Sequence, residues 1–152
     1  MTVETPESLN LFTNADASIN YTKEIETVIA SLADDGRAMV GHSEAGDVWK
    51  FKYGSVEVFV QLTGSTEDDT FTVWSPVLNL PTQDDAGLMK KLLQMNWSST
   101  FEACFALVDQ MIAVVASRTV ADLNPGEISR TITIVATIAD DNDDALIAEF
   151  KS

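Results

Sequence analysis

The sequence predicts an α+β protein with three helices packed on an antiparallel sheet, which is built from a three-strand meander and a two-strand hairpin. The hairpin is the clearest signal, because residues 103–117 form two apolar runs around Asp109 and Gln110, with apolar side chains on both faces of both strands. Strand-length segments follow one another over residues 48–77, and helical apolar spacing recurs in three other places. A hairpin that is apolar on both faces needs a cover on each. We therefore expect helices on one face and a second subunit or a bound segment on the other.

Length and charge set the broad class of the protein. A chain of 152 residues predicts one domain, which we place at residues 19–152, after a loose arm over residues 1–18 that lacks periodicity. The chain carries 24 acidic residues against 9 lysines and arginines, a net charge of −15. Such a surface repels phosphate backbones and anionic lipids, which argues against nucleic-acid and membrane partners and favours basic ones. The sequence shows no secretory signal and no membrane-spanning run, so we expect a cytoplasmic protein.

The first two helices are expected over residues 20–33 and 82–96, where apolar residues follow the spacing of one helical stripe. Thr82 is expected to cap the second helix, with an acid three residues later. Between the helices, a short strand is expected over residues 38–41 and a polar loop over 42–47.

The meander strands are expected over residues 48–53, 56–62 and 71–77. A two-residue turn that begins at Gly54 fixes the register of the first two strands and places Lys52 opposite Glu57 on the outer face. On the same face, Phe59 and Trp74 become cross-strand neighbours. The inner face is wholly apolar, so it should form the core.

The third helix is expected to begin after Asn124, whose side chain caps it while Glu127 completes the capping box. Threonine and isoleucine alternate over residues 131–138, which also fits a strand. The predicted Asn124 cap favours a helix instead. The acidic run over residues 140–144 is the place where this helix would be interrupted.

The sequence predicts no catalytic, cofactor or metal site, and hence no enzyme. Cys104 lies mid-strand in an apolar run, so we expect a buried, inert thiol. His42 is the only histidine, which argues against a zinc site or a catalytic triad. The acids of residues 140–144 lack the alternate spacing and the glycine of a calcium loop, so we expect a solvated acidic face there.

Two surfaces are candidate binding sites. Phe59 and Trp74, with Lys50 beside them, could bind an apolar segment of a partner; burial under the arm or under a second subunit is the alternative. The second surface is the apolar side of the second helix, which is a candidate homodimer interface or simply part of the core. Its residues are Met89, Leu93, Met95 and Trp97, whereas neighbouring Leu92 is expected in the core.

Six short segments carry a family resemblance. They are residues 74–78, 95–97, 100–103, 118–123, 125–130 and 138–143. With the order helix, meander, helix, hairpin, helix, the chain over residues 48–150 resembles the type III secretion chaperone-like fold, and more specifically the YbjN-type chaperone-like proteins of cyanobacteria. The resemblance implies an α+β fold, homodimers and binding of protein segments without catalysis, and it brings no catalytic residues with it.

Two functions stay open from the sequence. The first is a non-catalytic, dimeric, chaperone-like module that binds basic or apolar segments of other proteins. The second is a structural or regulatory interaction protein with one fixed partner. Capture of many clients from a lysate would indicate the first, and capture of one stoichiometric partner would indicate the second.

Overall fold

A computed structural model describes residues 19–151 as six strands and three helices. The helices are α2 (Tyr21–Leu32), α3 (Asp85–Ser98) and α4 (Pro125–Phe150). The strands are β1 (Met39–Ser43), β2 (Gly46–Tyr53), β3 (Val56–Leu62), β4 (Thr70–Asn79), β5 (Cys104–Val108) and β6 (Met111–Thr119). All six form one antiparallel sheet in the order β1-β2-β3-β4-β6-β5, so the predicted α+β class is confirmed and the meander and hairpin share one sheet. The arm predicted over residues 1–18 lies outside the described residues.

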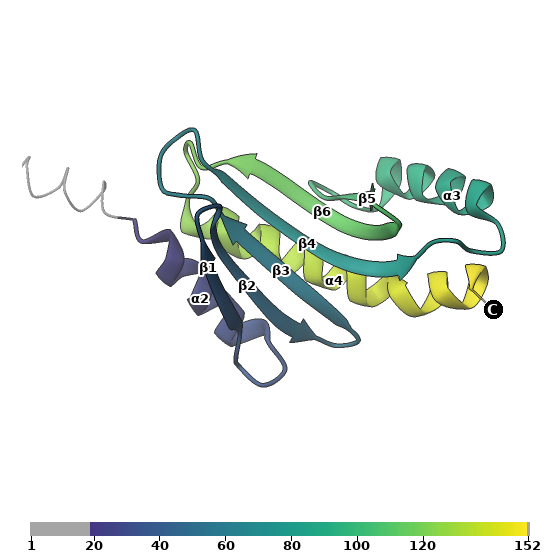
Figure 1. Cartoon of the computed structure of the whole chain (residues 1–152), viewed down its shortest axis with the longest axis horizontal. Helices are drawn as coiled ribbons and strands as arrows, with labels where there is room; N and C mark the ends of the chain where they lie inside the picture. The colour runs from purple at the N-terminus through teal and green to yellow at the C-terminus, as the bar shows by residue number, and fades with distance from the viewer. Residues whose placement is uncertain (1–18, 152) are drawn as a thin grey trace, which may run out of the picture.

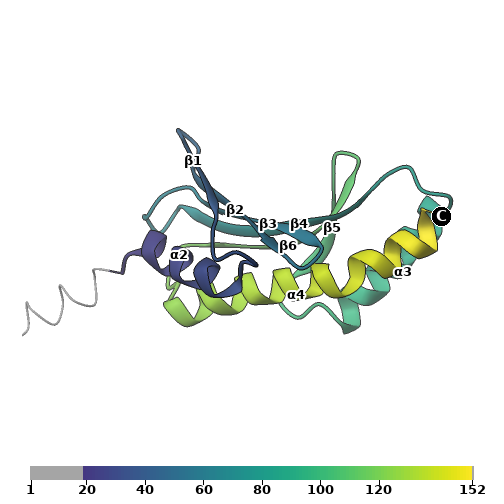
Figure 2. The ribbon, with the colours of Figure 1, turned by 90° about the horizontal axis from the view of Figure 1, so that it is seen from below.

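The molecule has two layers, a sheet and a helical layer (Figures 1 and 2). The long helix α4 runs beneath the sheet, with α2 beside it under the β1–β2 end and α3 at the β5 end. The core fills the space between the layers, because every second strand residue and the apolar stripes of the helices point into it. Its largest fully buried side chains include Trp49, Phe71, Ile25, Leu88 and Ile132.

The predicted register of the meander is confirmed. Tyr53 pairs with Val56 and Lys52 with Glu57 across the turn at Gly54, whose φ is +57°. Beyond this turn α4 braces the strands, since Asp140 accepts hydrogen bonds from the backbone N–H of Ser55 (2.9 Å) and from its hydroxyl (3.0 Å). A side chain at residue 54 would collide with the Asp140 carboxylate, so glycine serves this close approach as well as the turn.

The loop predicted over residues 42–47 is wrong, because most of that segment belongs to a hairpin. β1 continues to Ser43 and β2 begins at Gly46, whose φ of +107° allows the tight reversal between them. All five residues of β1 are exposed. A short edge strand with a central glycine lacks the apolar alternation that reveals the other strands.

The first helix is confirmed, with Asn20 accepting a hydrogen bond from the N–H of Lys23 as its cap. The second helix starts later than predicted. Asp84 caps α3 by accepting from the N–H of Gly87 (3.0 Å), whereas Thr82 donates its hydroxyl to the carboxylate of Asp85 (2.5 Å). Thr82 therefore fixes the loop before the helix, and capping by Thr82 is a wrong prediction.

The third helix runs unbroken over 26 residues, with the predicted Asn124 cap in place. The expected interruption at residues 140–144 is wrong, because Asp140 and Asp143 face the sheet and bind Ser55. The hydroxyl of Ser55 also lies 2.7 Å from the second carboxylate oxygen of Asp143, a residue that is only 5% exposed. The solvated acidic face is therefore confirmed for Asp141 and Asp144 but not for Asp143.

The hairpin of β5 and β6 turns at Asp109 and Gln110, as predicted. The prediction of a buried Cys104 is wrong, since this side chain is exposed. β5 is the last strand of the sheet, and Cys104 lies on the face opposite to the helices, next to Val115 of β6. The apolar run around Cys104 predicts a strand, but it does not reveal that this strand lies at the edge of the sheet.

Candidate functional site

The face of the sheet that turns away from the helices is the candidate site. Figure 2 shows all three helices on one side of the sheet, and nothing within residues 19–151 covers the other side. We call this surface the open face. Along β3, for example, Val58 and Val60 are completely buried toward α4, while Phe59 between them is only half-buried on the open face.

The centre of the open face is an aromatic pair. The rings of Phe59 and Trp74 stack with their centroids 5.2 Å apart and their planes 7° from parallel. Lys50 is the direct cross-strand neighbour of Phe59, and its Nζ lies 3.1 Å from the carboxylate of Glu57. The structure thus brings together all three residues predicted for partner binding, Phe59, Trp74 and Lys50, whereas Lys52 pairs with Glu57 only in strand register.

Strand register extends this centre into a row that crosses the whole sheet. From β1 to β5 the row contains Met39, Lys50, Phe59, Trp74, Val115 and Cys104. Five strand spacings give it a length of about 24 Å. Only one of its members is charged, so the row offers an apolar track that a segment of another chain could follow across the strands.

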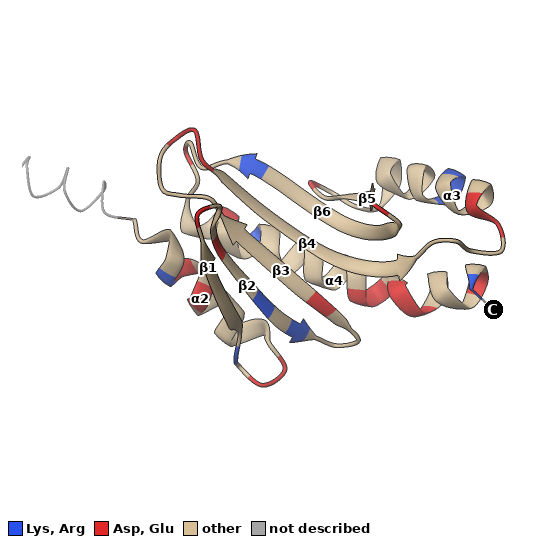
Figure 3. Ribbon diagram, viewed as in Figure 1, with Lys and Arg blue, Asp and Glu red and all other residues tan. Residues whose placement is uncertain are grey.

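The open face carries few charged side chains. Its strand side chains include one acid, Glu57, and two lysines, Lys50 and Lys52. Figure 3 views the sheet from this side and shows the acidic residues mainly on the loops and helices around it. With a net charge of −15 over the whole sequence, a nearly neutral apolar surface stands out as a place for contact with another molecule.

A second apolar surface lies where α3 meets β5. Leu93 is 69% exposed and Trp97, one turn further along α3, is 92% exposed. Met89 and Met95, predicted with them, are partly buried against the core, and Leu92 is buried as expected. The predicted interface residues therefore divide into two that face solvent and two that support them.

The second surface also includes residues that were not predicted from the sequence. Phe101 after α3 is 78% exposed and Leu107 on β5 is 53% exposed. Leu107 and Leu93 line one cavity of about 210 Å³ between helix and strand. The side chain of Asn96 joins the two elements, since it accepts from the N–H of Phe105 (2.7 Å) and donates to its carbonyl (3.2 Å). Exposure of Leu107 follows from the edge position of β5, which local sequence does not reveal.

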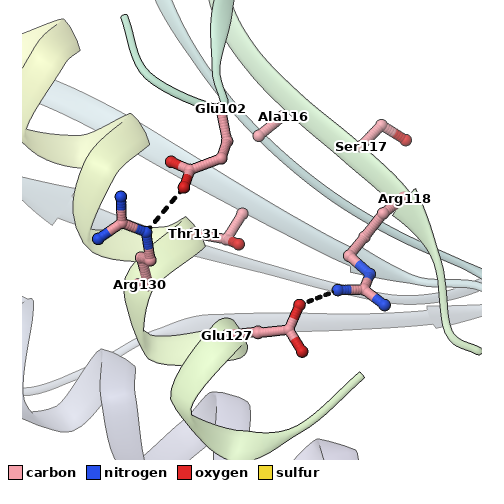
Figure 4. A pocket seen from close by; sticks show the side chains of 7 residues that line it. All are labelled: Glu102, Ala116, Ser117, Arg118, Glu127, Arg130 and Thr131. Carbon is pink, nitrogen blue, oxygen red and sulfur yellow. Dashed lines mark hydrogen bonds and ion pairs between the residues drawn. The ribbon is translucent and has the colours of Figure 1, made fainter. Parts of the chain in front are cut away.

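Two arginines, Arg118 and Arg130, line a groove of about 270 Å³ between the end of β6 and the first turns of α4 (Figure 4). Arg118 pairs with Glu127, and its other nitrogens donate to two backbone carbonyls. Arg130 donates to Glu102 (2.8 Å), which holds the pKa of that carboxyl below its usual value. Both guanidinium groups thus tie loops to α4, so this groove is a structural brace.

The acidic side chains and the one histidine, His42, are the groups to consider for metal binding and acid–base chemistry. Residues 19–151 contain no group of three side chains placed to hold a metal ion. His42 forms a 2.6 Å contact with Asp47 on the exposed β1–β2 hairpin, where the hydroxyl of neighbouring Ser43 bonds the backbone of the turn. In the same range no helix has the length and apolarity to cross a membrane.

Comparison with known families gives one match over most of the chain. Residues 22–148 match the family model of YbjN, which is described as "Putative bacterial sensory transduction regulator". No curated protein matches the sequence.

Comparison with solved structures agrees with the fold. A chain of the crystal structure of the ExsC–ExsE complex superposes with a TM-score of 0.57 at 17% identity. The match covers 84% of this chain and 97% of the other. The likeness shows a shared chaperone-like fold.

Proposed function

The chain belongs to the YbjN family, and from that premise we propose that it is a non-catalytic module that binds a segment of another protein on its open face. One observation carries the proposal: the stacked rings of Phe59 and Trp74 stay partly exposed at the centre of an uncovered sheet face. Burial of apolar surface contributes about 25 cal/mol per Å², so two large rings offer a partner substantial free energy.

The fold supports a protein partner. The related structure is a complex of two different proteins, ExsC and ExsE, so a complex built on this fold exists. The row through Phe59 and Trp74 crosses the sheet from edge to edge, which suits an extended segment with several apolar anchors.

The charge around the open face indicates the composition of the partner segment. The centre of the face is apolar, and the loops at its rim carry acids such as Glu67, Asp68 and Asp109. A segment with apolar residues in the middle and basic residues at its ends matches both zones. We place this binding in the cytoplasm.

The second surface is proposed as the contact between two copies of the chain. Exposed Trp97 and Leu93 lie one helical turn apart on α3, and β5, the last strand of the sheet, is beside them. Packing of this surface against its copy would bury both side chains by two-fold symmetry. The open face remains free in such a dimer.

An interaction protein with one fixed partner is the second candidate. The family description as a sensory transduction regulator favours it, since a regulator commonly acts on one defined target. The two candidates share the same surface and differ in the number of proteins that it binds.

Quantitative capture from lysate of the source organism tests the proposal. The tagged wild type, Trp74→Ala and Trp97→Ala are compared, so that each variant loses one tryptophan from a different surface. We expect Trp74→Ala to lose the proteins that the wild type and Trp97→Ala retain. Many lost proteins indicate a chaperone-like module and one lost protein a fixed partner. Equal retention by all three variants would contradict the proposed docking face.

A further inference from the structure

We propose that residues 1–18 of the same chain occupy the open face when no partner is bound, so that a partner segment must displace them. This inference rests on the proposed function, because it concerns regulation of the same surface. Three observations carry it: the chemistry of the face, the chemistry of the segment and the reach of the chain between them.

The face offers an incoming segment an apolar centre and, inside the acidic rim, two lysines on one neighbouring strand. Phe59, Trp74 and Val115 form the apolar centre of the row, and Lys50 and Lys52 lie on the adjacent strand. Lys52 is exposed and forms no ion pair with another residue of the 19–151 range. Because Lys50 already pairs with Glu57, a carboxylate of the incoming segment would be attracted mainly to Lys52.

Residues 1–18 have the matching composition. The segment contains the acids Glu4, Glu7 and Asp16 and no lysine or arginine. Its apolar centre includes Leu9 and Leu11, which point to the same side when the backbone is extended. Both apolar anchors and negative charge are thus within one short stretch of chain.

The segment is long enough to reach the centre of the face. It precedes α2, which begins at Tyr21 and lies beneath the β1–β2 end of the sheet (Figure 2). Eighteen residues span up to about 60 Å when extended. From the β1 edge to Trp74 on β4 the path crosses three strand spacings, about 15 Å. The length therefore allows for the passage around the edge and for contact with several members of the row.

The tether gives this occupant an advantage over a free segment. Because the segment is part of the same chain, its effective concentration at the face is on the order of 1 mM. A modest intrinsic affinity is then enough to keep the apolar row covered, while a partner with more or better anchors can still displace it. The arm thereby sets a threshold of affinity that excludes weak, non-specific partners.

The single native cysteine provides the test. Cys104 lies in the same row as Trp74, two strand spacings or about 10 Å away. In the full chain with a nitroxide on Cys104, we expect the amide resonances of residues 9–12 to be broadened and to recover when the nitroxide is reduced. Trp74→Ala should abolish this broadening, and Trp97→Ala should leave it unchanged. Sharp resonances of residues 9–12 in the labelled wild type would overturn the proposal.

A mixing control identifies whose arm is bound. Isotope-labelled Cys104→Ser chain is mixed with nitroxide-labelled chain at natural isotope abundance. We expect no broadening of residues 9–12 in this mixture, because each arm binds its own sheet. Broadening as strong as in the singly labelled sample would assign the face to the arm of a second copy and overturn the intramolecular proposal.

A binding measurement tests displacement with a defined probe, a fluorescent peptide of residues 1–18. We expect it to bind the full-length double variant Leu9→Asp, Leu11→Asp about tenfold more tightly than the wild type, whose own arm competes. Equal affinities would overturn the inference. Failure of the inference is distinct from failure of the proposed function, because Trp74-dependent capture of other proteins does not require the arm to bind.

Discussion

At the scale of single residues, the account depends on Trp74, whose indole stacks on Phe59 on a surface that no described residue covers. A side chain in this position contributes little to the core, since the core lies on the other side of the sheet. Its removal should therefore separate binding from stability.

We predict that Trp74→Ala weakens partner binding and lowers the free energy of unfolding only by the value of a surface ring pair, about 0.5–1.5 kcal/mol. Phe51→Ala is the control, because Phe51 is 3% exposed and its loss should open a cavity at a cost of about 3–5 kcal/mol. Urea denaturation measures both values. Equal destabilisation by the two variants would show that Trp74 belongs to a core or to an obligate interface.

Cys104 yields a second residue-scale prediction, which follows from its exposure. Because the thiol is on the open face, Cys104→Ala should change the free energy of unfolding by less than about 0.5 kcal/mol. Denaturant unfolding of the variant measures this change. A loss of several kcal/mol would mean that the side chain is buried against another part of the protein.

At the scale of elements, the predicted helices and strands are correct where a local turn or a helix cap fixes the backbone geometry. The turn at Gly54 and Ser55 sets the β2–β3 register, and the Asn124 cap sets the start of α4. The predictions failed where the outcome depends on distant contacts. The unbroken course of α4 through its acidic run depends on Ser55, 85 residues away from Asp140, and the exposure of Cys104 depends on the order of strands in the sheet.

The candidate surfaces were predictable to a similar degree. Phe59, Trp74 and Lys50 could be grouped because strand alternation and register place them on one face. Leu107 was missed because its exposure follows from the position of β5 at the edge, which arises from the pairing of β6 with β4. Phe101 was missed because it lies in the turn between α3 and β5, where no apolar periodicity predicts the direction of a side chain.

The cap of α4 is testable on its own. Asn124 accepts a hydrogen bond from the N–H of Glu127 (2.9 Å), so Asn124→Ala should lower the free energy of unfolding by about 1 kcal/mol. Ser129→Ala, an exposed change in the same helix, should alter it by less than about 0.5 kcal/mol. Denaturant titration compares the two variants, and an equal effect would contradict the role of the cap.

The loop before α3 gives a pH prediction. Hydrogen bonds from the hydroxyl and the N–H of Thr82 lower the pKa of Asp85. The carboxylate's stabilising contribution is therefore fully present above the usual aspartate pKa, about 3.9, and is lost as pH falls through the lower folded value. Carboxyl NMR titration should show this low pKa in the wild type and a rise toward the usual value in Thr82→Val. An unchanged value in the variant would remove Thr82 as the cause.

At the scale of the whole molecule, the charge distribution separates the surfaces by role. Acids of this chain, whose net charge is −15, lie mainly on loops and helices, while the open face and the α3–β5 surface are largely apolar. Two apolar surfaces on one small protein allow it to bind its copy with one and another protein with the other.

The proposed dimer follows from the second surface. Light scattering at micromolar concentration should give twice the chain mass of 16.5 kDa for the wild type, and the chain mass itself for Trp97→Asp. Lys23→Asp, a charge change at an exposed position of α2, at the opposite end of the molecule from α3 (Figure 1), is the control and should remain dimeric. A monomeric wild type would contradict the proposal of a homodimer.

Site-specific photo-crosslinking in cells shows whether the open face binds other proteins. A photoreactive amino acid replaces Gln61, which lies on the open face beside Phe59, or Asp141, which is exposed on α4. The account predicts that position 61 crosslinks to other proteins and that position 141 does not. Equal crosslinking from both positions, or crosslinks from position 61 only to the same sheet face of a second copy, would contradict it.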